Sequence, residues 1–408
     1  MHNCEIAALQ SPQFVKYYYS GMQSSRNLSP SSTAETSGLR FNRFEWAGAF
    51  GDLGTLIPFV IAYIALGHLD PVGIFLSFGL ALCATGAYYR TPFPVQPMKA
   101  IGAAAATQAG ITAGTIYAAG LITGVIWIIL GITGAAHRIA KLLPRPVAVG
   151  IILGLGIGFM LEGVRMMASA WVIAVFALTL ALLLIDSRRF PVMFLLLAGG
   201  AAYQLVLTPE LLDQMREIDP HLRLPAFTWP EIGMKELGLA AVMLALPQVP
   251  LTLGNAIIAV SDENNRIFPH RPVTEKQVAI STGIMNIGAS AIGGVPMCHG
   301  AGGMAGHVRF GATTGGAPII LGMLLIVLAL FFGSSIETLL KLFPAALLGV
   351  ILFIAGAQLA LGSCDFSSEK NERFATLVTT AFAIWNVGAA FVAGAAILYA
   401  LKRGWIRL

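Results

Sequence analysis

The feature that most constrains this chain is a series of apolar runs, each long enough to cross a lipid bilayer. A membrane helix needs roughly 20 mostly apolar residues, and uninterrupted runs of this kind cover 113–135, 147–164, 168–185, 190–207 and 314–333. Further apolar runs at 45–67 and 237–260 are interrupted by Pro, Gly or polar residues. Together with shorter segments, they predict an all-α integral membrane protein with about fourteen spans.

Composition excludes several classes of protein. Hydrophobic residues make up 56% of the 408 residues and charged residues 11%, about half the charged fraction of a soluble domain. The net charge is +5, but the basic residues lie in short loops without interleaved aromatics, so a nucleic-acid partner is excluded. The four cysteines form no C-x-x-C pair. We therefore expect no disulfide framework, no metal site and no cofactor.

Charge also predicts the orientation in the membrane. Basic residues cluster before the first span, between the fourth and fifth, between the sixth and seventh, and after the last. An even number of spans puts these clusters on one side, which the positive-inside rule makes cytoplasmic. Both termini are therefore predicted in the cytoplasm. The short loops and the lack of a transit peptide favour a bacterial inner membrane.

An internal repeat divides the chain. Short matches recur at an offset of 199 or 200 residues: Pro-Met at 97 and 296, Leu-Gly at 53 and 253, and weakly Leu-Pro at 143 with Phe-Pro at 343. Such short matches can arise by chance. Each lies at the same place in its half, however, so two seven-span repeats are preferred, and an odd number of spans makes them inverted.

These boundaries give four predicted regions. Residues 1–43 are polar, Ser-rich and unlike a signal peptide, so we predict a disordered cytoplasmic tail. Membrane repeat one covers 44–207 and membrane repeat two covers 237–408. Between them, 208–236 is a loop on the extracytoplasmic side in which acidic residues outnumber basic ones.

Two segments, 92–110 and 294–312, are too rich in Gly and Pro to span as plain helices. Each begins with a stretch that Pro holds extended and continues with small residues that favour a short helix starting near mid-membrane. Irregular backbone at that depth must be buried or line a cavity. Because the repeats are inverted, the two half-helix N-termini would face one another. Their free N–H groups and dipoles predict an anion site.

Polar residues accompany both half-helices, and each has two interpretations. Lys99 either attracts the anion or pairs with an acid or snorkels to the surface. Gln96 either donates to an oxyanion or caps a backbone group. For His299 a structural hydrogen bond that holds the Gly-rich turn is preferred over anion binding or pH sensing. Cys298 is interpreted as a small residue at a tight position.

Further polar residues enter the core of two other spans. Asp52 either carries a coupling proton or pairs with Lys99, or it satisfies backbone N–H groups freed near Pro58. Gln248, Thr252 and Asn255 fall at i, i+4 and i+7, so they share one helix face. They would line a cavity or join two helices.

The stretches FGDLGT, PFPVQPMKA, LPQVPLTLGNAIIA and PMCHGAGGMAGHVRFGA resemble the molybdate-transporter family, a branch related to the sulfate permeases. The resemblance covers roughly 44–400 and implies inverted repeats split into core and gate domains, homodimers and an oxyanion held between the half-helices. It implies a binding site formed by Gln96, Met98, Lys99, Ala100, His299, Gly300, Ala301 and Gly302, with Asp52, Thr55, Gln248 and Asn255 nearby. The chain stops at Leu408, so we expect no regulation through a C-terminal cytoplasmic domain.

The sequence therefore predicts a secondary active transporter of molybdate, proton-coupled through Asp52. No G-x-x-x-x-G-K-[ST] loop is present, so we expect no ATPase activity. No nucleophile–base set suggests an intramembrane enzyme. Sulfate, which has the same charge and shape, is an alternative substrate. An uncoupled anion channel is an alternative mechanism.

Overall fold

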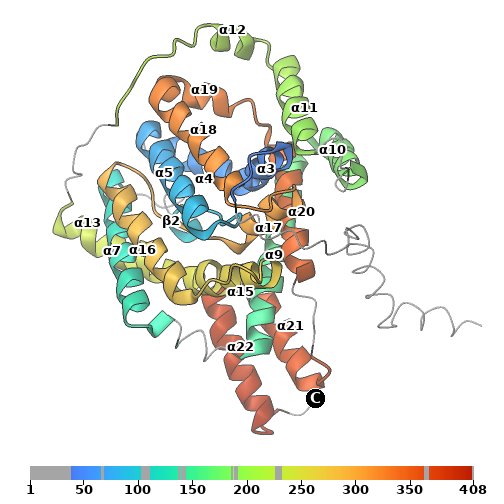
Figure 1. The fold of residues 1–408 in the computed structure, drawn as a ribbon. Helices are drawn as coiled ribbons and strands as arrows, with labels where there is room; N and C mark the ends of the chain where they lie inside the picture. Colours follow the sequence, from blue (N-terminus) through green and yellow to red (C-terminus); the bar gives the residue numbers. More distant parts are fainter. Residues whose placement is uncertain are drawn as a thin grey trace, which may run out of the picture. The chain divides into compact units, whose positions relative to one another are not determined.

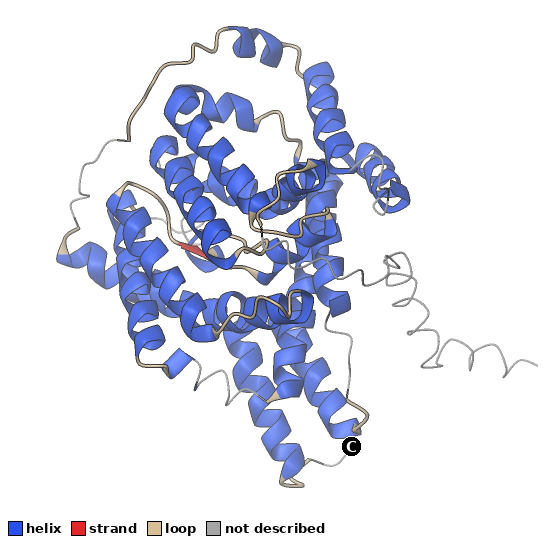
Figure 2. Ribbon diagram, in the orientation of Figure 1, coloured by secondary structure: helices blue, strands red, loops and turns tan. Residues whose placement is uncertain are grey.

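The computed structural model describes residues 38–406, except 66–68, 103–110, 137, 139–143, 185–186, 188–191, 226–231 and 363–366. Most of the predicted tail and the end of the 92–110 segment therefore lie outside the described residues. The regular secondary structure of the described part is helical apart from two short strands, and loops connect these elements (Figures 1 and 2). This agrees with the predicted all-α membrane class.

The first half contains α3 (Arg43–Ala49), the 3₁₀ turn η1 (Phe50–Asp52), α4 (Leu53–Ala65), α5 (Pro71–Tyr89), α7 (Ala113–Ile132), α9 (Arg145–Met167), η2 (Ala168–Ala170), α10 (Trp171–Leu184) and α11 (Val192–Leu207). The break in the first apolar run lies at η1, and α4 continues through Pro58. The predicted loop contains α12 (Glu210–Arg216).

The second half begins with one helical run made of α13 (Met234–Leu239), η3 (Ala240–Ala245), α14 (Leu246–Leu251), η4 (Thr252–Ala259) and α15 (Val260–Ile267). Segments η3 and η4 are π-helical. After them come α16 (Glu275–Ala291), α17 (Ala301–Arg309), α18 (Gly316–Phe332), η5 (Gly333–Ser335), α19 (Ile336–Leu340), α20 (Ala345–Gly362), α21 (Lys370–Trp385) and α22 (Val387–Lys402).

Within the described residues, four helices are long and apolar enough by length and composition to cross a membrane, or five if one bent pair forms a span. The predicted spans at 147–164 and 168–185 fall within a single helical stretch of 40 residues, Arg145–Leu184. At 1.5 Å per residue this stretch is about twice the thickness of the hydrocarbon core. The bent pair joins α11 to α12 at 109°.

Local sequence explains where several of these helices begin. The Asp70 side chain accepts the Val72 N–H at the start of α5, with Pro71 in the first turn. Thr112 and Thr115 form a capping box at the start of α7, and Thr274 and Gln277 form one at the start of α16. Such caps satisfy N–H groups that the first helical turn leaves unbonded.

The most extensive helix contacts join α9 to α20, α5 to α18, and α7 to α16. Glycines allow these close approaches. A Cβ at Gly163 would lie 2.6 Å from the Gly349 carbonyl oxygen, and a Cβ at Gly349 would lie 2.6 Å from the Gly163 carbonyl oxygen. Reciprocal glycine pairs also occur between α5 and α18 and between α7 and α16, at Gly79–Gly322 and Gly124–Gly283. Small residues are the usual means of close helix packing in membranes.

The two broken segments meet through a short antiparallel ladder. Strand β1 (Gln96–Pro97) pairs with β2 (Met297–Cys298), with Gln96 opposite Cys298. The Met98 N–H also donates to the Pro296 carbonyl over 2.9 Å. Residues 99–102 are helical after β1, and α17 follows β2. Each segment is thus extended and then helical, as its sequence predicts.

The buried carboxylate of Glu45 on α3 holds the turn before α18. It accepts from the Thr313 and Thr314 N–H groups, both over 3.0 Å, from the Thr313 hydroxyl over 2.8 Å, and from the Ala317 N–H over 3.1 Å. One buried carboxylate therefore satisfies several donors of this turn at once.

We expect Glu45→Gln to lower the thermal unfolding temperature of the purified protein. An amide offers one oxygen, so its NH₂ group would face a backbone donor that the carboxylate now accepts. The free energy of unfolding should fall by about 2 kcal/mol, which is typical of a hydrogen bond to a charged group. Exposed Glu217→Gln is the matched control and should leave the temperature unchanged. Equal unfolding temperatures for Glu45→Gln and the wild type would contradict this role.

Candidate functional site

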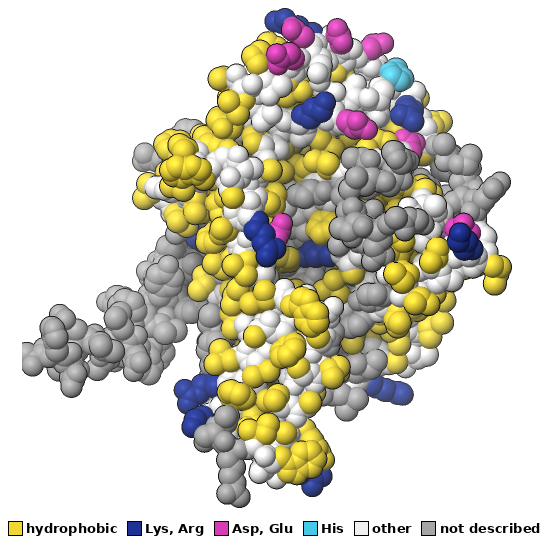
Figure 3. Space-filling view, turned by 180° about the vertical axis from the view of Figure 1, so that it is seen from behind, with side chains coloured by type: hydrophobic (Ala, Val, Ile, Leu, Met, Phe, Trp, Pro, Cys, Tyr) yellow, Lys and Arg dark blue, Asp and Glu magenta, His cyan; other side chains and the backbone are white. Residues whose placement is uncertain are grey.

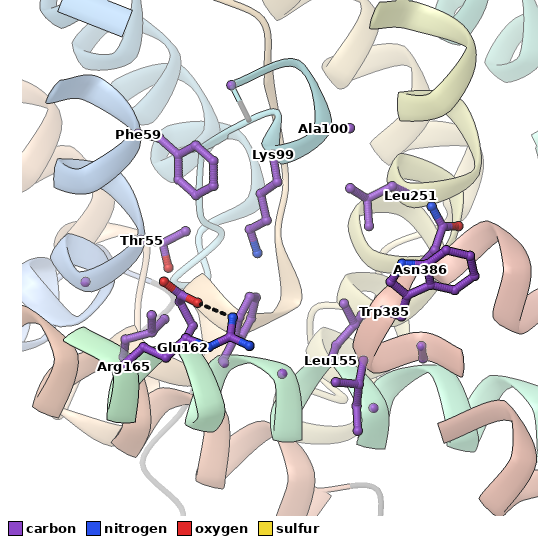
Figure 4. Close-up of a pocket in the computed structure, with 18 of the residues that line it drawn as sticks. Thr55, Phe59, Lys99, Ala100, Leu155, Glu162, Arg165, Leu251, Trp385 and Asn386 are labelled. Carbon is purple, nitrogen blue, oxygen red and sulfur yellow. Dashed lines mark hydrogen bonds and ion pairs between the residues drawn. The ribbon is translucent and has the colours of Figure 1, made fainter. Parts of the chain in front are cut away.

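A cavity of about 530 Å³ opens beside the first half-helix. Residues from α4, α9, α14 and the end of α21 line it together with Lys99 and Ala100 (Figure 4). In this view the Lys99 side chain extends from the half-helix into the space between α4 and α9. Thr55 and Phe59 lie on one side of it, and Leu251 and Asn386 lie on the other.

Lys99 carries a buried ammonium group without a hydrogen-bond partner. Its Nζ atom has no hydrogen-bond partner among the described residues. The Nζ atom lies over an aromatic ring, 3.7 Å from the centroid of Phe159 on α9. Burying a charge without a hydrogen bond is costly, and an ionisable group inside a membrane segment is usually functional. The Lys99 ammonium therefore does not reach the surface, and it interacts electrostatically with Asp52 without a direct hydrogen bond.

Asp52 is the last residue of η1 and lies beside Gln96 and Gly303. It is 4% exposed, and its Oδ1 accepts from Gln96 Nε2 over 2.5 Å. A Cβ at Gly303 would lie 2.6 Å from Asp52 Oδ2, so the other carboxylate oxygen faces the first turn of α17. Asp52 thus contacts elements from both halves of the chain, and its hydrogen-bond partners include Gln96 and Thr55.

Gln248 connects the second half to the first half-helix. Its Oε1 accepts the Ala100 N–H over 2.8 Å, and its Nε2 donates to Thr252 Oγ1 over 2.9 Å. The Ala100 N–H, which the sequence analysis predicted to bind an anion, therefore donates to an amide oxygen of the protein instead. Asn255 is buried with no partner for its Oδ1 among the described residues.

His299 holds the turn between β2 and α17. Its Nδ1 donates to the Pro94 carbonyl over 2.8 Å. A carbonyl only accepts, so Nε2 of a neutral ring accepts from the Ser281 hydroxyl at 2.8 Å. The Tyr89 hydroxyl lies 2.7 Å from the same serine oxygen. Both ring nitrogens are therefore used inside the protein, which is the structural role that the sequence favours.

The small residues of the second half-helix leave room for larger neighbours. A Cβ at Gly300 would overlap the Gln96 side chain, and a Cβ at Gly302 would overlap the Phe159 ring. Ala301 and Met98 are fully buried. Thr55, Lys99 and Ala100 line the cavity directly. The structure thus gathers most of the predicted residues around the paired strands.

Sequence reasoning missed Phe159, Ser281 and Tyr89. Phe159 lies within an apolar run and carries no pattern that separates it from its neighbours. Ser281 and Tyr89 meet His299 only through the tertiary fold. In the described part of the chain, no cluster of three or more His, Cys, Asp or Glu residues could hold a metal ion.

Solved structures of anion transporters share this fold. The murine solute carrier 26 family member A9 anion transporter, in its inward-facing state, has a TM-score of 0.59 at 13% identity, covering 96% of this chain and 76% of that one. The transmembrane domain of the cyanobacterial bicarbonate transporter BicA has a TM-score of 0.56 at 15% identity, covering 88% of this chain and 98% of that one. The chain therefore has the fold of a multi-pass membrane anion transporter.

Sequence comparison identifies the family. A family model described as "Molybdate transporter of MFS superfamily" matches residues 44–159 and 240–359. Molybdate transporter 2 of Arabidopsis thaliana is 30% identical, covering 88% of this chain and 87% of that protein. Molybdate transporter 1 of Chlamydomonas reinhardtii is 27% identical, covering 86% and 89%. The chain belongs to the molybdate transporter family, which confirms the resemblance found in its motifs.

Proposed function

We propose that this protein is a secondary active transporter that moves molybdate across the cytoplasmic membrane. The observation that carries the proposal is the buried Lys99 ammonium, which extends into the cavity from the start of a half-helix without a hydrogen-bond partner among the described residues. A tetrahedral dianion supplies the missing negative charge and the missing acceptors.

The binding site in this proposal lies between the two half-helix starts. Lys99 and the first N–H groups of α17, at Ala301 and Gly302, donate to the anion. Ala100 donates once the Gln248 amide oxygen releases its N–H. Gln96, Met98 and Gly300 shape the site, with Thr55 and Asn255 at its edges. His299 supports the site by holding the turn, and it does not itself contact the anion.

The proposed architecture has fourteen spans in two inverted repeats, divided into core and gate domains. Shifted by 200 residues, α5, α7 and α9 overlap α16, α18 and α20. Helix α5 contacts α18, the counterpart of α7, and α7 contacts α16, the counterpart of α5. A two-fold relation between the halves requires this exchange. Helix α9 contacts its own counterpart, α20. This pattern supports the proposal beyond the short sequence matches.

Surface charge supports the proposed orientation. Figure 3 shows Asp and Glu side chains gathered with some Lys and Arg at the end of the molecule that carries α12, whereas the charged side chains visible at the opposite end are Lys and Arg. The basic end would then be cytoplasmic. A homodimer in a bacterial inner membrane, with both termini cytoplasmic, completes the proposal.

Coupling to protons would run through Asp52. Its carboxylate is buried beside both half-helices, so its charge and that of Lys99 belong to one site. A proton taken up by Asp52 would change the charge of the loaded site and so bias the direction in which it opens.

The experiment that tests the substrate is calorimetry of molybdate and sulfate, singly and in competition, with the purified full-length protein. Tight molybdate binding that excess sulfate does not displace supports the proposal. Equal competition favours the sulfate alternative, and binding of neither anion contradicts the proposal. Saturable uptake into proteoliposomes distinguishes a transporter from a channel, whose flux would follow the anion gradient without saturation.

Charge at the cavity mouth gives a kinetic prediction. Glu162 and Arg165 both line the cavity and form an ion pair of 3.1 Å. Replacing Arg165 with Gln leaves Glu162 unbalanced, which repels an approaching anion. We expect initial molybdate uptake at low salt to fall a few-fold, and the difference to vanish near 0.5 M salt because exposed charges are screened. Glu162→Gln is the matched control and should raise the rate. A loss that does not depend on salt would contradict this explanation.

A further inference from the structure

The ring of Phe159 touches both features that the proposed function assigns to the anion. Its centroid lies 3.7 Å from Lys99 Nζ. The same ring packs on the first turn of α17, where a Cβ at Gly302 would overlap it. Phe159 also lines the cavity, although only 9% of its surface is exposed. One side chain therefore covers the charge on one half-helix and the N-terminal turn of the other.

An oxyanion that binds these groups needs the space that the ring occupies. The ring offers the ammonium only its π face, which partly compensates a desolvated cation but supplies no hydrogen bond. An anion would replace that contact with charge-assisted hydrogen bonds, which are stronger. Ring and anion cannot both lie against Lys99 and Gly302.

The ring also comes from a different part of the fold than the groups it covers. Lys99 and Gly302 follow β1 and β2, which are paired with each other. Phe159 belongs to α9, whose most extensive contacts are with α20 and α21. The ring can therefore leave the site by a change of its own rotamer or by a shift of α9, while the paired strands stay intact.

We propose that Phe159 is an internal competitor of the anion, whose ring occupies the anion's place in the empty transporter. This inference rests on the proposed anion site and adds a specificity-determining residue to it. Anions that cannot bond to both half-helices do not displace the ring. A tetrahedral dianion does, because its oxygens reach Lys99 and the α17 N–H groups together.

The test compares molybdate affinity, measured by calorimetry on the purified full-length protein, between the wild type and two variants. Phe159→Met keeps an apolar side chain of similar size but removes the π face. We expect it to bind molybdate about tenfold more tightly, the equivalent of one desolvated cation–π contact. Phe159→Tyr keeps the ring and should match the wild type. Phe176→Met, on α10 and exposed away from the cavity lining, is the control and should also match.

A ring with only a packing role would give the opposite result, because its loss would loosen the site and weaken binding. Unchanged or weaker affinity in a Phe159→Met protein that unfolds at the wild-type temperature overturns the inference. If that variant does not fold, Phe159→Leu is measured with the same criterion. Failure of the wild type itself to bind molybdate would instead refute the proposed function.

Discussion

Replacing Lys99 with Met is expected to weaken molybdate binding by roughly 10- to 100-fold, the loss of one or more charge-assisted hydrogen bonds in a desolvated site. The ammonium has no other hydrogen-bond partner in the described residues, so its removal takes away binding without breaking an internal network. The thermal unfolding temperature should stay the same or rise, because the buried charge is gone. Calorimetry and thermal unfolding on the same preparation measure both effects.

The matched control for this substitution is Lys402→Met at the end of α22, where the side chain is exposed. It removes the same charge without touching the cavity and should leave affinity unchanged. If Lys99→Met binds molybdate as the wild type does, Lys99 is not a ligand. If it binds weakly and also unfolds at a much lower temperature, the role of Lys99 is structural.

Replacing Asp52 with Asn is expected to abolish accumulation of molybdate against its gradient while leaving binding largely intact. Asparagine keeps an oxygen that accepts from Gln96 Nε2, so the local hydrogen bond survives. It cannot take up a proton. In proteoliposomes with an imposed pH gradient, the ratio of internal to external molybdate should fall from several-fold to about one, since no coupled proton remains to drive it.

Exchange of labelled for unlabelled molybdate should continue in this variant, because exchange needs the anion site but no net driving ion. Asp213→Asn, in the exposed α12, serves as the control for a lost carboxylate. An Asp52→Asn protein that still concentrates molybdate would refute the coupling role. Loss of exchange together with accumulation would place Asp52 in the anion site instead.

The sequence predicted the secondary structure of the two broken segments, but it did not predict that these segments pair with each other. Prolines before Lys99 and before His299 indicated an extended stretch followed by a short helix, and the structure has this in both places. The reason is local, since proline restricts itself and the residue before it. The pairing of Gln96 with Cys298 joins positions some 200 residues apart, and local propensity carries no information about such a partner.

The spans were harder to count because the rules assume polar loops between them. Between α9 and α10 there is no loop, because the 3₁₀ turn Ala168–Ala170 joins the two helices into one helical stretch. Likewise, Gln248 and Asn255 share a face in an ideal α-helix, but η3 and η4 are π-helical and alter the period. Gln248 reaches the Ala100 N–H, and Asn255 lies buried in η4 with no partner for its Oδ1 among the described residues.

The two-residue ladder between β1 and β2 also bears on how the protein is made. The Met98 N–H has its acceptor at Pro296, which leaves the ribosome about 200 residues later. At the usual rates of synthesis the first segment waits roughly 10 to 40 seconds for its partner. During that interval its backbone groups cannot remain unbonded in lipid. The first broken segment must therefore be kept near water or another protein until the second arrives, and residues around Pro97 would be protected only late in biogenesis.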